Sequence, residues 1–140
     1  EGVATFAGSD QLAAFADGLN IVVSVLPLTP ETTGIMNAGF FAMLADGAFI
    51  INGGRGPQVD DDDLLVALDS GKLGGAALDV FAVEPLPQDH PFWTHPKVRV
   101  WPHVAAQTNA TSAAEQVAAA ITAMMDGSEP ANRVDWSRGY

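Results

Sequence analysis

The sequence predicts an α/β fold of the doubly wound type, in which helices flank a parallel β-sheet. Four short apolar runs do not alternate with polar residues, a pattern typical of strands buried on both faces of a parallel sheet. Helical patterns with recognisable first and last residues lie between these runs. The chain has 140 residues, of which 48% are hydrophobic, and this suits one domain of ordinary size.

The four predicted strands are the apolar runs at residues 21–26, 48–51, 75–81 and 98–101. Each predicted helix but the last follows a residue whose side chain can accept a hydrogen bond from the N–H groups of the first turn, and glycines follow most of the helices. The helices are predicted over residues 10–17 after Ser9, from Pro30 after Thr29, over 38–46 after Asn37, over 61–70 after Asp60, and over the Ala-rich segment 111–127.

Four consecutive aspartates, Asp60 to Asp63, concentrate negative charge in one short stretch of the chain. A calcium-binding loop would alternate its ligands with other residues and would contain a glycine, and this run does neither. Carboxylates in the first turn of a helix interact favourably with the helix dipole. The run is therefore interpreted as the start of a helix.

Composition excludes several function classes. The net charge of −11 disfavours binding to nucleic acid or to an anionic membrane, and no apolar run approaches the roughly 20 residues of a membrane span. Cysteine is absent, which excludes disulfides and thiolate metal sites and favours a reducing compartment, the cytoplasm. His90 and His95 lie in or next to a proline-rich loop without the spacing of metal ligands, and we interpret them as surface or packing residues; no metal site is predicted.

Residues whose side chains can take part in catalysis or ligand binding follow three of the predicted strands. The stretch Asn-Gly-Gly-Arg-Gly containing Arg55 follows the second strand, Asp79 and Glu84 lie at and after the end of the third, and His103 follows the fourth. In open parallel sheets, ligands bind just beyond the carboxyl ends of the strands. We therefore expect Arg55, Asp79, Glu84 and His103 to gather at one edge of the sheet.

These residue types suit the reduction of a 2-keto acid. The glycines let a flat ligand approach the backbone closely, and the arginine offers a bidentate fork to a carboxylate or a carbonyl oxygen. A histidine exchanges a proton near neutral pH, and a neighbouring glutamate holds its ring and favours the imidazolium. The arginine would bind and polarise the substrate, and the histidine would protonate its oxygen as a hydride arrives.

Structural interpretations of the same residues stay open at this point. Arg55 could cap a helix or pair with the aspartate run, and Glu84 could belong to an ordinary loop. His103 could be a buried structural histidine. Asp79 is either a structural hydrogen-bonding group or a contact to a cofactor amide.

Long segments of the chain resemble the D-isomer-specific 2-hydroxyacid dehydrogenase family. The matching pieces are VVSVLPLTPETTGIMN, LADGAFIINGGRG with the residues that run on to DVFAVEPLPQDHPFW, and VRVWPHVAAQT, and together they cover most of residues 20–108. The ending VDWSRGY and the loop PLPQDHPFW are most similar to the bacterial glyoxylate/hydroxypyruvate reductase branch of this family. The resemblance implies a Rossmann-like sheet and reduction of glyoxylate or hydroxypyruvate, as small 2-keto acids, with NADPH or NADH.

The resemblance also implies a role for each residue of the site. Arg55 matches the substrate-orienting arginine, Glu84 the glutamate that pairs with the catalytic histidine, and His103 the general acid/base. Gly54 departs from the small residues more usual before the arginine and is expected to loosen that turn. The positions that match contacts to the nicotinamide half of NADP or NAD, with NADP favoured, are Leu26, Pro27, Gly53, Asp79 and Ala105.

The resemblance further implies that the Rossmann-like fold is incomplete in these 140 residues. The family has an N-terminal substrate domain and a first βαβ unit with a G-x-G-x-x-G phosphate loop, and neither is recognised here. Residues 1–110 would form the C-terminal part of the nucleotide-binding domain, and residues 111–140 a helix and tail that pack on the absent substrate domain. The parent protein would be a homodimer. The alternative is a non-catalytic half-domain or interaction module of the same fold.

Overall fold

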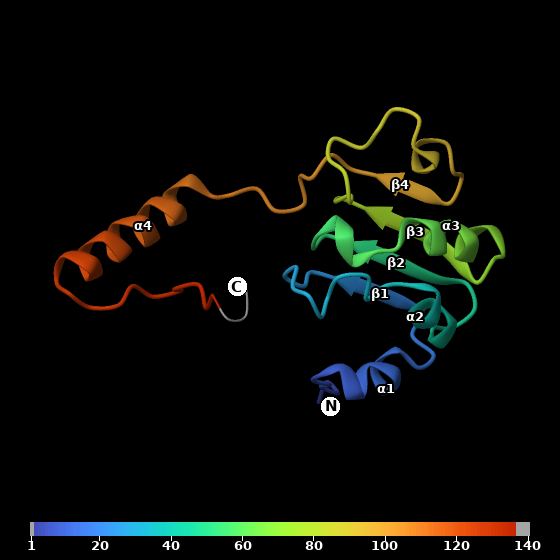
Figure 1. Ribbon diagram of the computed structural model, residues 1–140, viewed down its shortest axis with the longest axis horizontal. Helices are drawn as coiled ribbons and strands as arrows, with labels where there is room; N and C mark the ends of the chain where they lie inside the picture. The colour runs from blue at the N-terminus through green and yellow to red at the C-terminus, as the bar shows by residue number, and fades with distance from the viewer. Residues whose placement is uncertain (1, 137–140) are drawn as a thin grey trace. The chain divides into compact units, whose positions relative to one another are not determined.

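The computed structural model describes residues 2–136, and the chain divides into two compact units, Glu1–Ala105 and Ala106–Tyr140 (Figure 1). Residues 1 and 137–140 are not described, so the end of the VDWSRGY segment lies outside the described residues. The larger unit contains a four-stranded sheet with the order β1-β2-β3-β4, and every neighbouring pair is parallel. The predicted α/β fold with a parallel sheet is therefore confirmed.

Each predicted strand forms within or close to its apolar run, and the strand ends are level. The strands are β1 (Ile21–Ser24), β2 (Ala48–Asn52), β3 (Leu73–Leu78) and β4 (Val98–Val100). Their last residues are register partners: Ser24 pairs with Asn52, Asn52 with Leu78, and Leu78 with Val100. The segments that leave the four strands consequently begin at one edge of the sheet.

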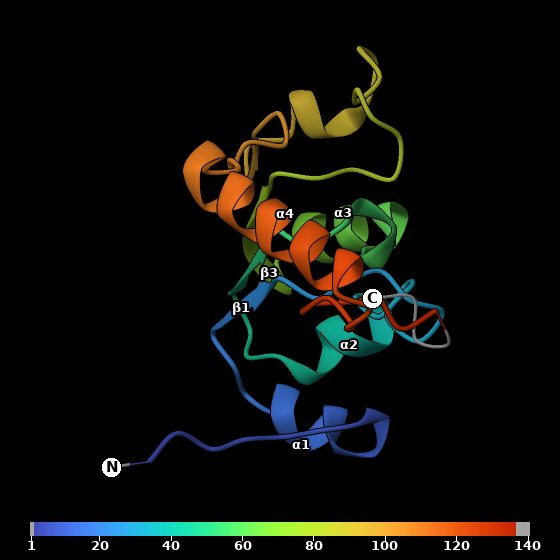
Figure 2. The ribbon, with the colours of Figure 1, turned by 90° about the vertical axis from the view of Figure 1, so that its left-hand side faces the viewer.

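Two helices, α2 (Ala38–Met43) and α3 (Asp61–Asp69), cover the same face of this sheet (Figure 2). Burial alternates along β1 and β2, because every second side chain points into the core beneath these helices. The expectation that both faces are buried is therefore wrong for β1 and β2, whereas every residue of β3 is buried or half-buried. The apolar side chains on the other face are between 39% and 59% exposed, and they are Ile21, Val23, Phe49 and Ile51.

The predicted starts of α2 and α3 are confirmed by hydrogen bonds. Asn37 accepts one from the backbone N–H of Phe40 at 3.2 Å, and Asp60 accepts one from the N–H of Asp63 at 3.0 Å. The aspartate run is thus the cap and first turn of α3. Asp63 also accepts a hydrogen bond from the N–H of Ala38 at 2.8 Å, which joins the starts of the two helices.

Two predicted helix starts are wrong. Ser9 does not cap a helix but lies inside a 3₁₀ turn (Ser9–Gln11) that leads into the short helix α1 (Leu12–Ala16). Thr29 opens a single turn, closed by a hydrogen bond from the N–H of Thr33 to its carbonyl at 3.0 Å, and no helix follows. The turn ends at Gly34, whose φ is 64°, and beyond it Met36 forms a parallel bridge with Val59.

The smaller unit contains helix α4 (Ala110–Met125), which begins one residue earlier than predicted. Asn109 caps it by accepting hydrogen bonds from the N–H groups of Thr111 and Ser112 at 3.0 and 3.1 Å. No side chain of α4 is buried. The packing of this helix on a substrate domain stays a prediction. None of the described helices combines the length and the apolar character needed to cross a membrane.

Candidate active site

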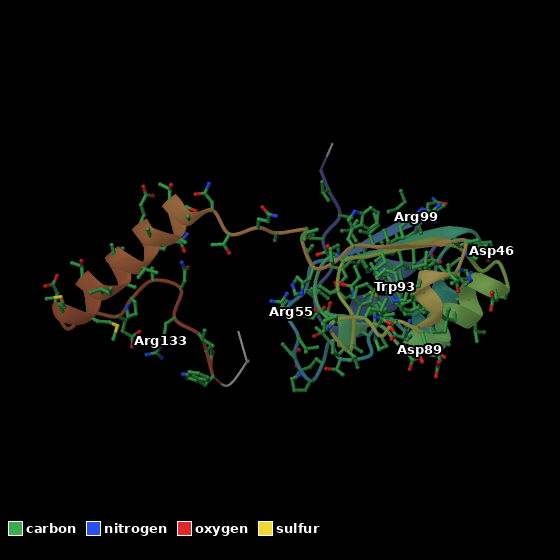
Figure 3. The ribbon with its side chains drawn as sticks, turned by 90° about the horizontal axis from the view of Figure 1, so that it is seen from above. Asp46, Arg55, Asp89, Trp93, Arg99 and Arg133 are labelled. Atoms are coloured by element: carbon green, nitrogen blue, oxygen red, sulfur yellow. The ribbon has the colours of Figure 1, made fainter. Side chains whose placement is uncertain are left out.

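The candidate site lies at the carboxyl edge of the sheet. Asp46, just before β2, and Arg55, just after it, lie at opposite ends of the larger unit (Figure 3). The hydrogen bonds from Gly53 N–H to Ser24 O at 2.9 Å and from Asp79 N–H to Asn52 O at 3.0 Å continue the sheet pairing beyond the strands. The segments that follow β1, β2 and β3 are therefore joined at this edge.

His103 and Glu84 form a hydrogen-bonded pair, with Nδ1 of the ring 2.8 Å from Oε2 of the carboxylate. Glu84 is itself held by the N–H of Phe81, which donates to its other oxygen at 2.9 Å. The hydrogen bond with His103, then that from Phe81, and also the positive charge of Arg55 lower the pKa of Glu84 below its ordinary value of 4.5. Because Nδ1 faces Glu84, Nε2 is the ring nitrogen directed away from the carboxylate.

The backbone of His103 adopts a left-handed conformation, with φ of 56°. This conformation is strained for a residue with a Cβ atom and persists where the surroundings hold it. Asp79 supplies that hold: its two carboxylate oxygens accept hydrogen bonds from the N–H groups of Val104 and Ala105, each at 2.9 Å. Asp79 is buried and makes the structural hydrogen bonds that one interpretation of the sequence offered, and its contact with a cofactor stays a prediction.

Arg55 is exposed, and its Nη1 donates to the carbonyl of Gly54 at 2.7 Å. The loop that carries Arg55 touches the loop that leads to Glu84. A Cβ atom built on Gly56 would lie 1.8 Å from the carbonyl carbon of Phe81, so only glycine allows this backbone approach. The approach explains why the positive charge of Arg55 acts on Glu84.

The expected nicotinamide contacts also lie at this edge. A Cβ atom built on Gly53 would be 3.9 Å from both the Cβ of Ala105 and the carbonyl oxygen of Ser24, so small residues from two segments face one another. Leu26 and Pro27, which follow β1, are exposed. Small residues such as Gly53 and Ala105 leave room for a flat ring, which suits the nicotinamide half of a dinucleotide, and the contacts themselves stay predictions.

His90 and His95 lie outside this site. His90 Nε2 is 3.6 Å from Oδ2 of Asp61, and His95 Nε2 is 3.2 Å from Oδ1 of Asp69, so both histidines join the proline-rich loop to α3. These contacts agree with the interpretation of both residues as packing residues.

Sequence reasoning missed Gln58, a fully buried side chain that contacts three of the site's segments. A local signal was present: Gln58 is the third residue of a 3₁₀ turn (Gly56–Gln58), the position at which a side chain can reach back to the residue before the turn. The sequence also suggested that Gly54 loosens its turn. That expectation is wrong, because a Cβ on Gly54 would meet Gln58 Oε1 at 2.5 Å and Leu26 O at 2.9 Å.

Known proteins share both the sequence and the fold. The chain is 52% identical over its whole length to a glyoxylate/hydroxypyruvate reductase A of Serratia proteamaculans and 48% identical to that of Yersinia enterocolitica. It covers 45% of each, so the chain spans less than half the length of these curated relatives.

Solved structures agree. A D-isomer specific 2-hydroxyacid dehydrogenase from Xanthobacter autotrophicus, in complex with NADPH and MES, matches 96% of this chain and 56% of its own with 47% identity and a TM-score of 0.93. An NADPH-dependent glyoxylate/hydroxypyruvate reductase from Sinorhizobium meliloti, in complex with NADP and sulfate, matches 96% of this chain and 44% of its own with 40% identity and a TM-score of 0.90.

The family model for the NAD binding domain of the D-isomer specific 2-hydroxyacid dehydrogenases matches residues 2–105, which correspond closely to the larger unit. The chain therefore belongs to the D-isomer specific 2-hydroxyacid dehydrogenase family, and its larger unit is part of the NAD-binding domain.

Proposed function

We propose that this chain is part of an NAD(P)-dependent reductase that converts glyoxylate or hydroxypyruvate to the corresponding 2-hydroxy acid. The observation that carries the proposal is the His103–Glu84 pair, 2.8 Å apart, at the edge of the sheet where Arg55 also lies. The relatives with glyoxylate/hydroxypyruvate reductase activity in their names support the choice of substrate.

His103 acts as the general acid. With Nδ1 turned to Glu84, Nε2 carries the proton that is delivered to the carbonyl oxygen of the keto acid. Glu84 holds the ring in this orientation and stabilises the imidazolium, because an opposite charge in hydrogen-bond contact favours the charged form. Its two oxygens have separate partners, His103 and the N–H of Phe81, so the carboxylate cannot rotate without losing both.

Arg55 binds the substrate carboxylate and polarises the carbonyl group. Its guanidinium is exposed and can present a fork of donors to two oxygens of a 2-keto acid. The approach of Gly56 to Phe81 keeps this arginine on the side of the site where Glu84 supports His103. Binding and proton donation therefore converge on neighbouring oxygens of one small acid.

The residues suited to the nicotinamide are Leu26, Pro27, Gly53, Asp79 and Ala105. When bound, NADPH or NADH supplies the hydride that reaches the carbonyl carbon, while the proton from His103 reaches its oxygen. NADP is favoured because both solved structures described above contain NADPH or NADP. The net reaction consumes one keto acid, one NAD(P)H and one proton and yields one 2-hydroxy acid and one NAD(P)⁺.

The proposal includes a homodimeric parent protein in the cytoplasm. The family resemblance supports the dimer, and the absence of cysteine supports a reducing compartment. Analytical ultracentrifugation of the complete protein, with a mass twice that of its chain expected, tests the dimer.

The test of function is the consumption of NADPH or NADH by the complete protein with glyoxylate or hydroxypyruvate, and by its His103→Ala variant. Loss of the general acid is expected to lower kcat on the order of 10²–10⁴-fold. Near-wild-type turnover by the variant would refute the role of His103. A wild-type protein that binds NADPH, seen as quenching of tryptophan fluorescence, but reduces neither acid would favour the alternative of a non-catalytic module.

A further inference from the structure

We propose that Gln58 is a positioning residue of the candidate active site, whose buried amide sets the spacing between the Leu26–Pro27 segment and Arg55. The inference rests on the proposed function, in which Leu26 and Pro27 face the nicotinamide and Arg55 binds the keto acid. Gln58 itself would touch neither cofactor nor substrate. It acts through the backbone groups that it holds.

The amide of Gln58 makes four hydrogen bonds. Its Oε1 accepts from the hydroxyl of Ser24 and from the backbone N–H of Arg55, each at 3.1 Å. Its Nε2 donates to the carbonyl oxygens of Leu26 at 2.9 Å and Pro27 at 3.0 Å. These bonds use both hydrogens of the amide nitrogen and both lone pairs of its oxygen. One side chain therefore joins the end of β1, the segment after it and the arginine loop.

The partners also fix the orientation of the amide. The backbone N–H of Arg55 can only donate, and the carbonyl oxygens of Leu26 and Pro27 can only accept. A flipped amide would place its NH₂ group against a donor and its oxygen against two acceptors. A glutamate of the same shape would still accept from the N–H of Arg55, but a buried carboxylate has no hydrogen to offer the two carbonyls.

The backbone of the Gln58 turn is anchored independently of this side chain. The N–H of Gly34 donates to the carbonyl of Pro57 and that of Met36 to the carbonyl of Gln58, both at 2.9 Å. The N–H of Asp60 donates back to Met36 at 3.0 Å. The amide thus projects from a fixed base, and a change of side chain alters the contacts at the site more than the path of the turn.

Gly54 is matched to this arrangement. A Cβ atom at position 54 would lie 2.5 Å from Gln58 Oε1, 2.9 Å from Leu26 O and 3.3 Å from Leu26 N. The glycine that departs from the expected family pattern therefore leaves the space in which the Gln58 amide and the Leu26 backbone meet. The residues at positions 54 and 58 therefore both determine the spacing between the Leu26–Pro27 segment and Arg55.

The test uses the complete reductase that contains this chain and compares Gln58→Glu, Gln58→Met and Gly54→Ala with the wild type. Gln58→Met keeps the approximate volume and removes the polar atoms, and Gly54→Ala disturbs the same contacts without changing Gln58. Leu68→Ala is the matched control, because Leu68 is fully buried in α3 and its truncation lowers stability without reaching the site. The thermal midpoint, kcat, and KM for glyoxylate and for NADPH are measured for each.

We expect kcat/KM for glyoxylate to fall about 10²-fold in the three site variants, since displacement of a binding group by about 1 Å costs a factor of this size. The kcat/KM of Leu68→Ala for glyoxylate is expected to stay within about threefold of the wild-type value, even if its thermal midpoint falls as far as those of the site variants. Gln58→Glu, but not Gln58→Met, is expected to recover part of its activity as the pH falls, because the protonated carboxyl regains one donor.

The inference is overturned if kcat/KM of the Gln58 variants stays within about threefold of the wild-type value. It is likewise overturned if their loss of kcat/KM equals that of Leu68→Ala at the same thermal midpoint. It is also overturned if only Gly54→Ala is impaired, because the backbone of Leu26 rather than the amide would then set the spacing. A wild-type protein that reduces no 2-keto acid would instead refute the proposed function, and the inference with it. The two failures are therefore distinguishable by the wild-type assay alone.

Discussion

Replacement of Asp79 by asparagine tests the physical account of His103 directly. The carboxylate accepts two backbone N–H groups at 2.9 Å, and it holds the chain immediately after a residue with φ of 56°. Asparagine has nearly the same shape but only one acceptor atom. One of the two N–H groups, that of Val104 or that of Ala105, would then face an NH₂ group.

The expected loss of stability follows from these two contacts. A hydrogen bond to a charged group contributes about 1.5–3 kcal/mol, and a buried donor left unpaired costs about 1–3 kcal/mol. Asp79 is buried, but Val104 and Ala105 are exposed, so water can replace part of the lost hydrogen bond. We therefore expect Asp79→Asn to lower the free energy of unfolding by about 2 kcal/mol, and to lower kcat as His103 leaves its strained conformation.

The assay is equilibrium unfolding in urea without cofactor, followed by tryptophan fluorescence. Asp60→Asn is the matched control, because it makes the same chemical change at a helix cap where aspartate and asparagine are equivalent. We expect this control to stay within about 0.5 kcal/mol of the wild type. If Asp79→Asn has wild-type stability and only weakens cofactor binding, Asp79 is a ligand contact and our account of the His103 backbone is refuted.

Three further predictions follow from other contacts. Gly56→Ala should destabilise the protein by about 3 kcal/mol or prevent folding, because its Cβ would lie 1.8 Å from the backbone of Phe81; urea unfolding measures this, and wild-type stability would contradict it. Glu84→Gln should lower the free energy of unfolding most above pH 4.5 and progressively less as the pH falls through the lowered pKa of Glu84. The reason is that the interactions of Glu84 stabilise the folded protein only while its carboxyl group is ionised; unfolding at several pH values checks the sign. In the isolated chain, the amides of α4 should exchange with solvent faster than those of β2 and β3, because no α4 side chain is buried; equal protection by hydrogen exchange would count against this.

The parts of the fold that depend on local signals were predictable. The four apolar runs became strands, and Asn37 and Asp60 cap helices because a cap needs only the next three residues. Thr29 is the same kind of capping signal, but only a single turn follows it and no helix forms. The turn ends at the left-handed Gly34, and Met36 then pairs with Val59, 23 positions further along, which no local pattern indicates.

The site shows the same division. Arg55, Glu84 and His103 were predicted to meet because parallel strands end at one edge, and that rule needs only the order of the strands. The role of Gln58 was not predictable in this way, because its carbonyl partners lie 31 and 32 residues earlier in the chain. The tight fit around Gly54 was not predictable either, because it depends on the backbone of Leu26, which is distant in the sequence.

The backbone contact between Gly56 and Phe81 has a consequence for the redesign of substrate preference. The arginine loop and the Glu84 loop meet without side chains between them, so neither can be lengthened or re-angled alone. Variation would have to come from side chains that already face solvent near this junction, such as Ala82 and Val83, with positions 54, 56 and 58 left unchanged. A directed-evolution library built on these two positions should retain more folded members than one that includes the glycines.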